Sequence, residues 1–204
     1  MSELKNTYNK IANDWHEDHK EDMWWREGVD HLISLLPPHA SILDVGCGAG
    51  HKSKYFSDRG LQVTGVDFSE GMIAVASKQV PTAHFQVLDM YKLDSLSETF
   101  DCVFAQASLL HIPKRDIPLV LGKLLQRLKP DGLLYVAVKE VREGDPEEKI
   151  EIENDYGYEY QRFFSYFTKD EVHTALQVAG LEIVKSEVIQ PGKTRWVQAI
   201  ARKK

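Results

Sequence analysis

Residues 42–50 constrain this chain more than any other feature, because an apolar run leads directly into three alternating glycines. The stretch reads Ile-Leu-Asp-Val-Gly-Cys-Gly-Ala-Gly. The apolar part suits a buried strand. Gly46, Gly48 and Gly50 suit a turn that a bulky ligand approaches closely, because glycine has no Cβ and permits positive φ. The dinucleotide fingerprint G-x-G-x-x-G would need its third glycine at position 51, where this sequence has His51.

Length and composition favour one globular domain. The chain has 204 residues, of which 43% are hydrophobic, which is enough for one substantial core and too many for a disordered chain. No apolar run approaches the roughly 18 residues of a membrane span, and the polar N-terminus does not look like a signal peptide. Cys47 and Cys102 are the only cysteines, which favours free thiols in a reducing cytoplasm. A catalytic or redox Cys47 is the minor alternative.

The charge balance bears on which binding partners the chain can have. A formal net charge of −6 disfavours nucleic acid, since phosphate contacts need a basic face. The acids concentrate in residues 140–159, which hold seven acids from Glu143 to Asp155 against Arg142 and Lys149. We interpret this segment as a solvated, mobile excursion. The alternative is an acidic rim that attracts a cationic substrate.

Strand-like and helix-like segments alternate from residue 41 onward, which predicts βαβ units and a parallel sheet with helices on both faces. The strand candidates are residues 42–45, 62–66, 84–88, 101–105 and 133–138. The helix candidates between them are residues 52–57, 71–78 and 117–128. Pro130-Asp131-Gly132 predicts a turn before the fifth strand.

Further signals lie at both ends of the chain. Residues 24–36 show a helical stripe that Pro37 and Pro38 end. Thr168 and Glu171 have the spacing of a capping box, which predicts that a helix starts there. Two strand candidates follow, at residues 181–188 and 195–201.

Three acids follow or end the first three predicted strands, where open α/β sheets bind ligands. Asp44 precedes the glycine turn, Asp67 ends the second strand, and Asp89 follows the third. Asp67 stands about 20 residues beyond the glycine turn, the position of a carboxylate that accepts ribose hydroxyls. The structural alternatives are an acid that pins a turn for Asp44, a helix cap for Asp67 and a surface loop for Asp89.

The glycine turn, the acids behind it and the closing strand pair resemble the class I S-adenosylmethionine-dependent methyltransferases, in the small-molecule, type 11-like branch. The resemblance covers nearly the whole chain. It implies a Rossmann-like α/β sandwich with a seven-stranded, mostly parallel sheet, an antiparallel last strand and helices on both faces. Within one domain, residues 1–36 would form a helical lid and residues 37–139 the cofactor-binding core. Residues 140–167 would be an acidic and aromatic insertion, and residues 168–204 a closing helix and strand pair.

The resemblance also implies which residues bind the cofactor. Asp44 and the glycine turn would hold the methionine end, Asp67 the ribose, and Asp89 with the N–H of Met90 the adenine. Tyr8 and Trp15 match an N-terminal lid segment whose aromatic faces attract a sulfonium, with ordinary packing as the alternative. The remaining candidates line the same pocket: Phe68, Met72, Gln106 and Ala107.

Two residues are candidates to face the substrate. His111 matches a histidine common in this branch, and it would act as a base, as a substrate contact or as a structural histidine. Arg162 belongs to the aromatic stretch of residues 156–166, which would border the acceptor pocket. His16 and His19 have no third ligand at suitable spacing, so no metal is predicted.

These observations predict an enzyme that transfers a methyl group from S-adenosylmethionine to a small molecule and leaves S-adenosylhomocysteine. The sulfonium is already activated, so a general base is needed only for a protonated acceptor, and no catalytic residue is assigned. One alternative is a module that binds S-adenosylmethionine without turnover. A weaker alternative is a nicotinamide-dependent oxidoreductase. The acceptor and the oligomeric state stay open.

Overall fold

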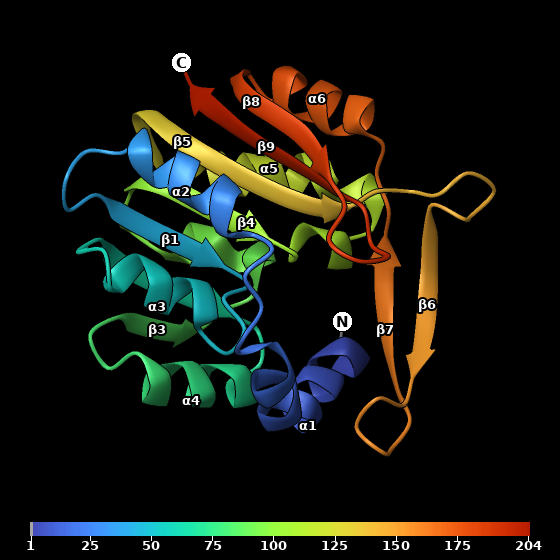
Figure 1. The fold of residues 1–204 in the computed structure, drawn as a ribbon. Helices are drawn as coiled ribbons and strands as arrows, with labels where there is room; N and C mark the ends of the chain where they lie inside the picture. Colours follow the sequence, from blue (N-terminus) through green and yellow to red (C-terminus); the bar gives the residue numbers. More distant parts are fainter. Residues whose placement is uncertain (1) are drawn as a thin grey trace.

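The computed structural model describes residues 2–204, so Met1 of the expected lid lies outside the described residues. A seven-stranded sheet has the strand order β3-β2-β1-β4-β5-β9-β8 (Figure 1). Its strands are β1 (Ser41–Val45), β2 (Gln62–Asp67), β3 (His84–Val87), β4 (Phe100–Gln106), β5 (Leu128–Lys139), β8 (Leu181–Ile189) and β9 (Trp196–Lys203). The first five strands are parallel, and β9 is antiparallel to both β5 and β8. The predicted fold class is confirmed.

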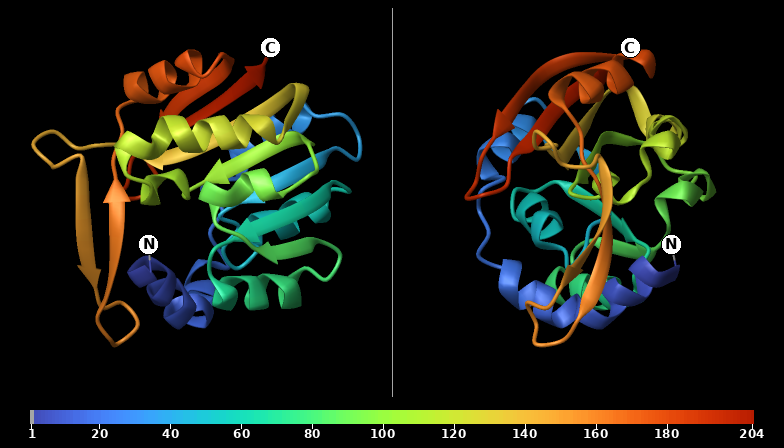
Figure 2. Two further views of the ribbon diagram at one scale, coloured as in Figure 1. Left: turned by 180° about the vertical axis from the view of Figure 1, so that it is seen from behind. Right: turned by 90° about the vertical axis from the view of Figure 1, so that its right-hand side faces the viewer.

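Helices cover both faces of the sheet (Figures 1 and 2). α2 (Arg26–Ser34) and α3 (His51–Ser57) pack on one face, around Ile42 and Phe104. α5 (Ile117–Gln126) and α6 (Lys169–Val178) pack on the other face, around Val103 and Leu134. Because side chains on both faces are buried, the central strands read as nearly continuous apolar runs.

The remaining helical elements lie along the carboxyl edge of the sheet or pack against its strands. α4 (Glu70–Gln79) packs against β2 and β3, and α1 (Ser2–His19) lies against α4 and the insertion. Short 3-10 turns are η1 (Met90–Ser95), η2 (Leu109–His111) and η3 (Lys114–Asp116). No helix among residues 2–204 combines the length and apolar character needed to cross a membrane.

The insertion contains a β-hairpin that the sequence did not predict. β6 (Glu148–Glu153) pairs antiparallel with β7 (Tyr160–Ser165) in a sheet of their own, which stands beside the main sheet (Figure 1). The side view shows α1 and this hairpin on the same side of the molecule (Figure 2). The hairpin and α1 are joined where Thr7 Oγ1 donates to the carbonyl oxygen of Gln161, at 2.9 Å.

Several acids of the insertion are paired, which weakens the expected picture of an open, solvated excursion. Glu153 forms an ion pair with Arg162 across the hairpin. Glu147 pairs with Lys114 at 2.8 Å, and Glu151 lies 3.8 Å from Lys139 at the end of β5. These pairs tie the hairpin to the core, while the other four acids, Glu143, Asp145, Glu148 and Asp155, stay exposed.

The expected turn at Pro130-Asp131-Gly132 is wrong, because β5 already begins at Leu128 and runs through it. Asp131 adopts a positive φ of 59° inside the strand. The pairing of β4 with β5 shifts register at the same place, between Phe100 and Cys102. Residues with turn chemistry therefore form an irregularity within a strand, which their sequence cannot distinguish from a true turn.

The predicted capping box at the start of α6 is confirmed. Thr168 Oγ1 accepts from the N–H of Glu171 at 3.1 Å, and the Glu171 carboxylate accepts from the N–H of Thr168 at 2.7 Å. Two helix N–H groups thus gain partners, which fixes the start of the helix.

Candidate ligand site

A cavity with about 890 Å³ of empty space lies at the carboxyl ends of β1, β2 and β4, beneath α1. We call it the main cavity. Thirteen predicted site residues line it: Tyr8, Trp15, Asp44, Gly46, Gly48, Asp67, Phe68, Met72, Asp89, Met90, Gln106, Ala107 and His111. Gly50 and Arg162 are predicted site residues that do not line it. The fold thus brings together residues that lie far apart in the sequence.

The three glycines of the turn do different work, although all have positive φ. A Cβ on Gly46 would clash with the side chain of Ser108, and one on Gly50 would lie 3.0 Å from the Cβ of Ala76 in α4. Gly50 therefore permits helix packing rather than ligand approach. Gly48, with φ of 53°, faces the Trp15 ring, and a Cβ there would lie 3.5 Å from that ring, at ordinary van der Waals distance.

Asp67 holds the glycine turn from the end of β2. One carboxylate oxygen accepts from the N–H of Gly48 at 3.0 Å, and the other accepts from the N–H of Ser69 at 2.9 Å. The side chain is buried yet lines the main cavity. Burial raises the pKa of Asp67 to about 6, against the lowering effect of these hydrogen bonds. The same carboxylate therefore holds the glycine turn and forms part of the cavity wall.

Asp44 and Asp89 stand on either side of Asp67. Asp44 accepts from Ser53 Oγ at 2.7 Å, and burial raises the pKa of Asp44 to about 6. Asp89 accepts from the N–H of Tyr91 at 3.0 Å and starts the turn η1. Both residues also line the main cavity. Each can therefore fix the local backbone and face a ligand at the same time.

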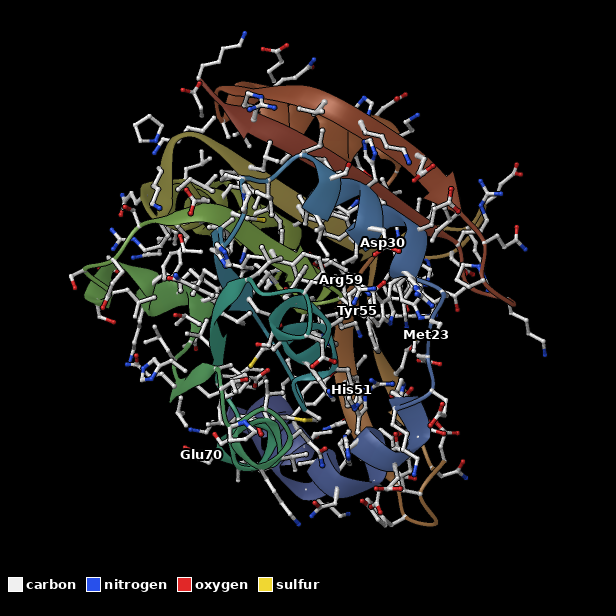
Figure 3. The ribbon with its side chains drawn as sticks, turned by 60° about the vertical axis from the view of Figure 1, so that its left-hand side comes forward. Met23, Asp30, His51, Tyr55, Arg59 and Glu70 are labelled. Atoms are coloured by element: carbon white, nitrogen blue, oxygen red, sulfur yellow. The ribbon has the colours of Figure 1, made fainter. Side chains whose placement is uncertain are left out.

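α1 covers the main cavity through contacts with α3 and α4. Trp15 stacks on His51 at a centroid distance of 5.5 Å, and His16 Nδ1 lies 2.7 Å from His51 Nε2. Asn9 accepts from Ser69 Oγ at 2.7 Å and donates to Glu70 at 3.0 Å. Glu70 and His51 are labelled in Figure 3. The helix is therefore anchored to both helices that border the glycine-turn side of the cavity.

Tyr8, His111 and Arg162 form a hydrogen-bonded chain. His111 Nδ1 lies 2.7 Å from the carbonyl oxygen of Phe163, so this nitrogen carries the proton. Nε2 is then an acceptor, and Tyr8 donates its hydroxyl proton to it at 2.6 Å. Burial lowers the pKa of His111 to about 3, which agrees with a neutral imidazole.

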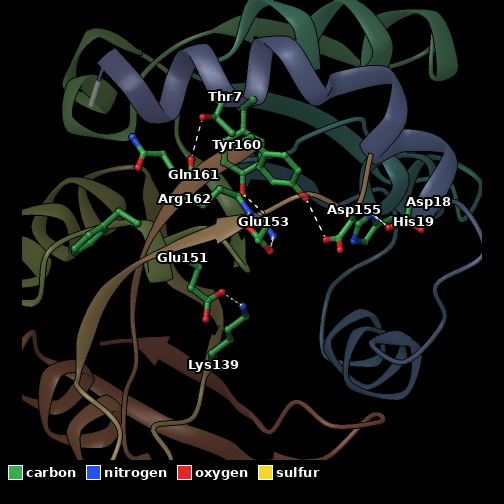
Figure 4. A network of polar contacts seen from close by, with 12 residues as sticks. Thr7, Asp18, His19, Lys139, Glu151, Glu153, Asp155, Tyr160, Gln161 and Arg162 are labelled. Atoms are coloured by element: carbon green, nitrogen blue, oxygen red, sulfur yellow. Dashed lines mark hydrogen bonds and ion pairs between the residues drawn. The ribbon is translucent and has the colours of Figure 1, made fainter. Parts of the chain in front are cut away.

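Arg162 lies behind Tyr8 rather than in the cavity wall. Its guanidinium donates to the Tyr8 oxygen at 3.4 Å. It also donates to Glu153 at 2.5 Å (Figure 4). Its charge is already paired, so Arg162 orients Tyr8 from outside the main cavity.

Sequence reasoning missed Lys52, which lies two residues beyond the last glycine of the turn. Its side chain lines the main cavity, and burial lowers the pKa of its ammonium group while Asp44 opposes that shift. The ammonium lies 5.4 Å from the centre of the Trp25 ring, and among residues 2–204 we find no hydrogen bond or ion pair to it. A partly buried cation without an ionic partner is costly, which makes Lys52 a candidate to meet an anionic group of a ligand.

Two other functional readings lose support from the structure. Burial raises the pKa of the Cys47 thiol well above its usual value, so this cysteine stays protonated and is a poor nucleophile. His16 bonds to His51, and residues 2–204 contain no group of three or more His, Cys, Asp or Glu side chains placed to hold a metal ion.

Comparison with known proteins shows a resemblance to methyltransferases over part of the chain. Residues 42–132 match the family described as "Methyltransferase domain". Trans-aconitate 2-methyltransferase of Deinococcus radiodurans is 36% identical over 112 residues, covering 52% of this chain and 42% of that protein. 2-methyl-6-phytyl-1,4-hydroquinone methyltransferase of a Synechocystis species is 36% identical over 109 residues, covering 52% and 34%. The aligned regions therefore span less than half of these relatives' length.

Solved structures share the whole fold. The 1,6-didemethyltoxoflavin-N1-methyltransferase of Burkholderia thailandensis, solved with 1,6-didemethyltoxoflavin and S-adenosylhomocysteine, superposes with a TM-score of 0.78 at 22% identity. That match covers 99% of this chain and 88% of the other. The magnesium protoporphyrin IX methyltransferase of Synechocystis has a TM-score of 0.75 at 16% identity, with 98% of each chain covered. Residues 42–132 therefore resemble a methyltransferase domain, and the whole chain has the fold of these two solved methyltransferases.

Proposed function

We propose that this protein binds S-adenosylmethionine in the main cavity and transfers its methyl group to a small-molecule acceptor. The observation that carries the proposal is the convergence of the glycine turn, Asp67 and Asp89 on one cavity beneath α1. A nicotinamide-dependent oxidoreductase is disfavoured, because His51 replaces the third fingerprint glycine and stacks on Trp15.

The residues present fit the cofactor group by group. The glycine turn and Lys52 would hold the carboxylate, because backbone N–H groups and a cation suit an anion. Asp67 would accept from the ribose hydroxyls and Asp89 from the adenine amino group, since carboxylates only accept. Phe68, Met72 and Met90 would pack against the apolar faces, and Tyr8 and Trp15 would cover the site. Gln106 and Ala107 would border the reacting end.

The chemistry asked of the chain is mainly positioning. Bound S-adenosylmethionine supplies an activated methyl group, so the protein has to orient the acceptor and exclude water. His111 is neutral, but its free lone pair already accepts from Tyr8. We therefore assign no side chain as a general base, and we assign His111 and Arg162 the task of fixing Tyr8 at the cavity wall.

Calorimetry with three ligands tests the proposal. S-adenosylmethionine and S-adenosylhomocysteine should bind at micromolar affinity, and NAD should show no heat of binding. Tight binding of NAD without a response to S-adenosylmethionine would contradict the proposal. Transfer of a labelled methyl group to a cell extract then separates an enzyme from a module that binds without turnover.

Replacing Lys52 with methionine should weaken S-adenosylhomocysteine binding about tenfold, close to 1.4 kcal/mol. The variant removes the only lysine or arginine among the residues that line the main cavity. Methylthioadenosine, which lacks the amino-acid end, should bind both proteins equally. Calorimetry with the two ligands measures this difference. Equal losses for both ligands would show that Lys52 shapes the cavity without meeting the carboxylate.

Residues 1–22 and 140–160 should act as a two-part lid. The hydroxyl of Tyr158 donates to Asp14 at 2.6 Å, so the two parts contact each other. Hydrogen exchange with and without S-adenosylhomocysteine should show protection rising first in α1, because Tyr8 and Trp15 line the main cavity. The insertion should respond mainly to the acceptor. Full protection of both segments without ligand would make them fixed parts of the core.

We also propose a cytoplasmic location and no nucleic-acid partner. Both cysteines are free and buried, as suits a reducing compartment. The net charge of −6 disfavours a broad basic surface for phosphates.

A further inference from the structure

The main cavity has a second half that the proposed cofactor contacts use only at Tyr8. Its wall comes from the first turns of α1 and from the segment after β4, and it includes Leu4, Tyr8, His111 and Ile112, with Ser108 at the border with the glycine turn. If the cofactor occupies the side of the glycine turn, Asp67 and Asp89, this half is where the acceptor enters. We call it the acceptor half, and its assignment rests on the proposed function.

Among residues 2–204, no charged residue lines the acceptor half. The charged residues that line the main cavity are Asp44, Lys52, Asp67 and Asp89, all on the cofactor side. Arg162 lies behind the wall, and it is paired with Glu153. A carboxylate brought here would lose its water and gain no cation, which is strongly unfavourable.

Most of the polar atoms in the acceptor half are already used. The Tyr8 hydroxyl donates to His111 Nε2, and His111 Nδ1 donates to the Phe163 carbonyl. Leu4 and Ile112 are buried and apolar, with 9% and 3% of their surface exposed. The wall is therefore largely apolar and suits a flat or hydrocarbon body.

Ser108 is the exception, together with Gln106 beside it. The Ser108 hydroxyl and both polar atoms of the Gln106 amide are buried without a hydrogen-bond partner in the part of the chain described. Ser108 is 4% exposed and Gln106 is 6% exposed, and both line the main cavity. Unpartnered buried polar atoms are rare in native proteins, and several at one wall indicate a polar group that a ligand supplies.

We infer that the acceptor is an uncharged molecule with an apolar body and a hydroxyl group, such as a phenol, and that Ser108 bonds this hydroxyl. A hydroxyl can both donate to and accept from Ser108 and the Gln106 amide without carrying charge. The acceptor half thereby selects against carboxylates of the same shape.

Matched pairs of small probes test this on the protein saturated with S-adenosylhomocysteine. The pairs are phenol with benzoate, p-cresol with p-toluate, and guaiacol with o-anisate. Saturation-transfer NMR should detect binding of the neutral member of a pair and no binding of its carboxylate partner. Ser108→Ala should weaken the neutral probe about fivefold, the usual size of one hydrogen bond. Carboxylates that bind as well as the phenols, or phenols that all fail to bind, would overturn the inference.

A second test introduces a positive charge into the acceptor half, which should reverse the preference for neutral probes. Leu4→Lys puts an ammonium group at the rim of the acceptor half, and it should let benzoate bind while phenol weakens. Leu4→Met is the matched control, because methionine is unbranched like lysine but uncharged, and it should keep the preference for phenol. Calorimetry with S-adenosylhomocysteine accompanies each variant. Failure of the wild-type protein to bind S-adenosylhomocysteine contradicts the proposed function, whereas normal binding with preferred carboxylates contradicts this inference alone.

Discussion

Replacing Gly48 with valine should abolish detectable binding of S-adenosylmethionine and S-adenosylhomocysteine. Gly48 has φ of 53°, which a branched side chain tolerates poorly, and a Cβ there would lie 3.5 Å from the Trp15 ring. The added methyl groups would fill the space between the turn and the lid, where we place the cofactor. Calorimetry gives the affinity, and thermal unfolding shows whether the variant still folds.

Gly144→Val is the matched control for backbone strain. Gly144 also has a positive φ, of 83°, but no atom lies within 4 Å of its Cβ position, and it belongs to the insertion. It should lose some stability and keep its affinity for S-adenosylhomocysteine. An unchanged dissociation constant in Gly48→Val would show that no ligand approaches the turn.

Replacing Asp67 with alanine should weaken cofactor binding by about 1.5–3 kcal/mol, the range for hydrogen bonds to a charged group. The carboxylate lines the main cavity and also accepts from the N–H groups of Gly48 and Ser69. Asp67→Asn separates these roles, since it keeps the shape and removes the charge. If calorimetry shows unchanged affinity in both variants, Asp67 is only a local cap.

The pH dependence of ligand affinity provides a second test of the role of Asp67. Its pKa is raised to about 6 by burial, and only the ionised carboxylate is free to accept on both oxygens. Affinity for S-adenosylhomocysteine should therefore fall as the pH drops through about 6, and Asp67→Asn should flatten this part of the profile.

The pH dependence of folding stability is opposite to that of ligand affinity. The folded chain binds the Asp67 proton more tightly than the unfolded chain, so this group stabilises the ligand-free protein at low pH. That contribution is lost as the pH rises through about 6.

Local sequence determined most of the elements of the core. The apolar runs, the glycine turn and the capping box at Thr168 each act within a few residues, so their structures follow from residue chemistry alone. The insertion shows the limit of this reasoning. The sequence did not predict that three of its acids are paired, because their partners Lys114, Lys139 and Arg162 come from η3, β5 and the opposite strand of the hairpin.

The residues of the candidate site also fall into those that the sequence predicted and those that only the tertiary structure placed. The sequence alone located Asp44, Asp67, Asp89 and the glycines, because strand ends of a parallel sheet meet at one edge and each acid lies at or near the end of its own strand. Only the tertiary structure decided the rest. It placed Lys52 in the cavity wall, moved Arg162 behind Tyr8, and left Ser108 without a partner. These outcomes depend on which segments fold over the sheet and on which polar atoms they satisfy, and spacing along the chain does not record such long-range contacts.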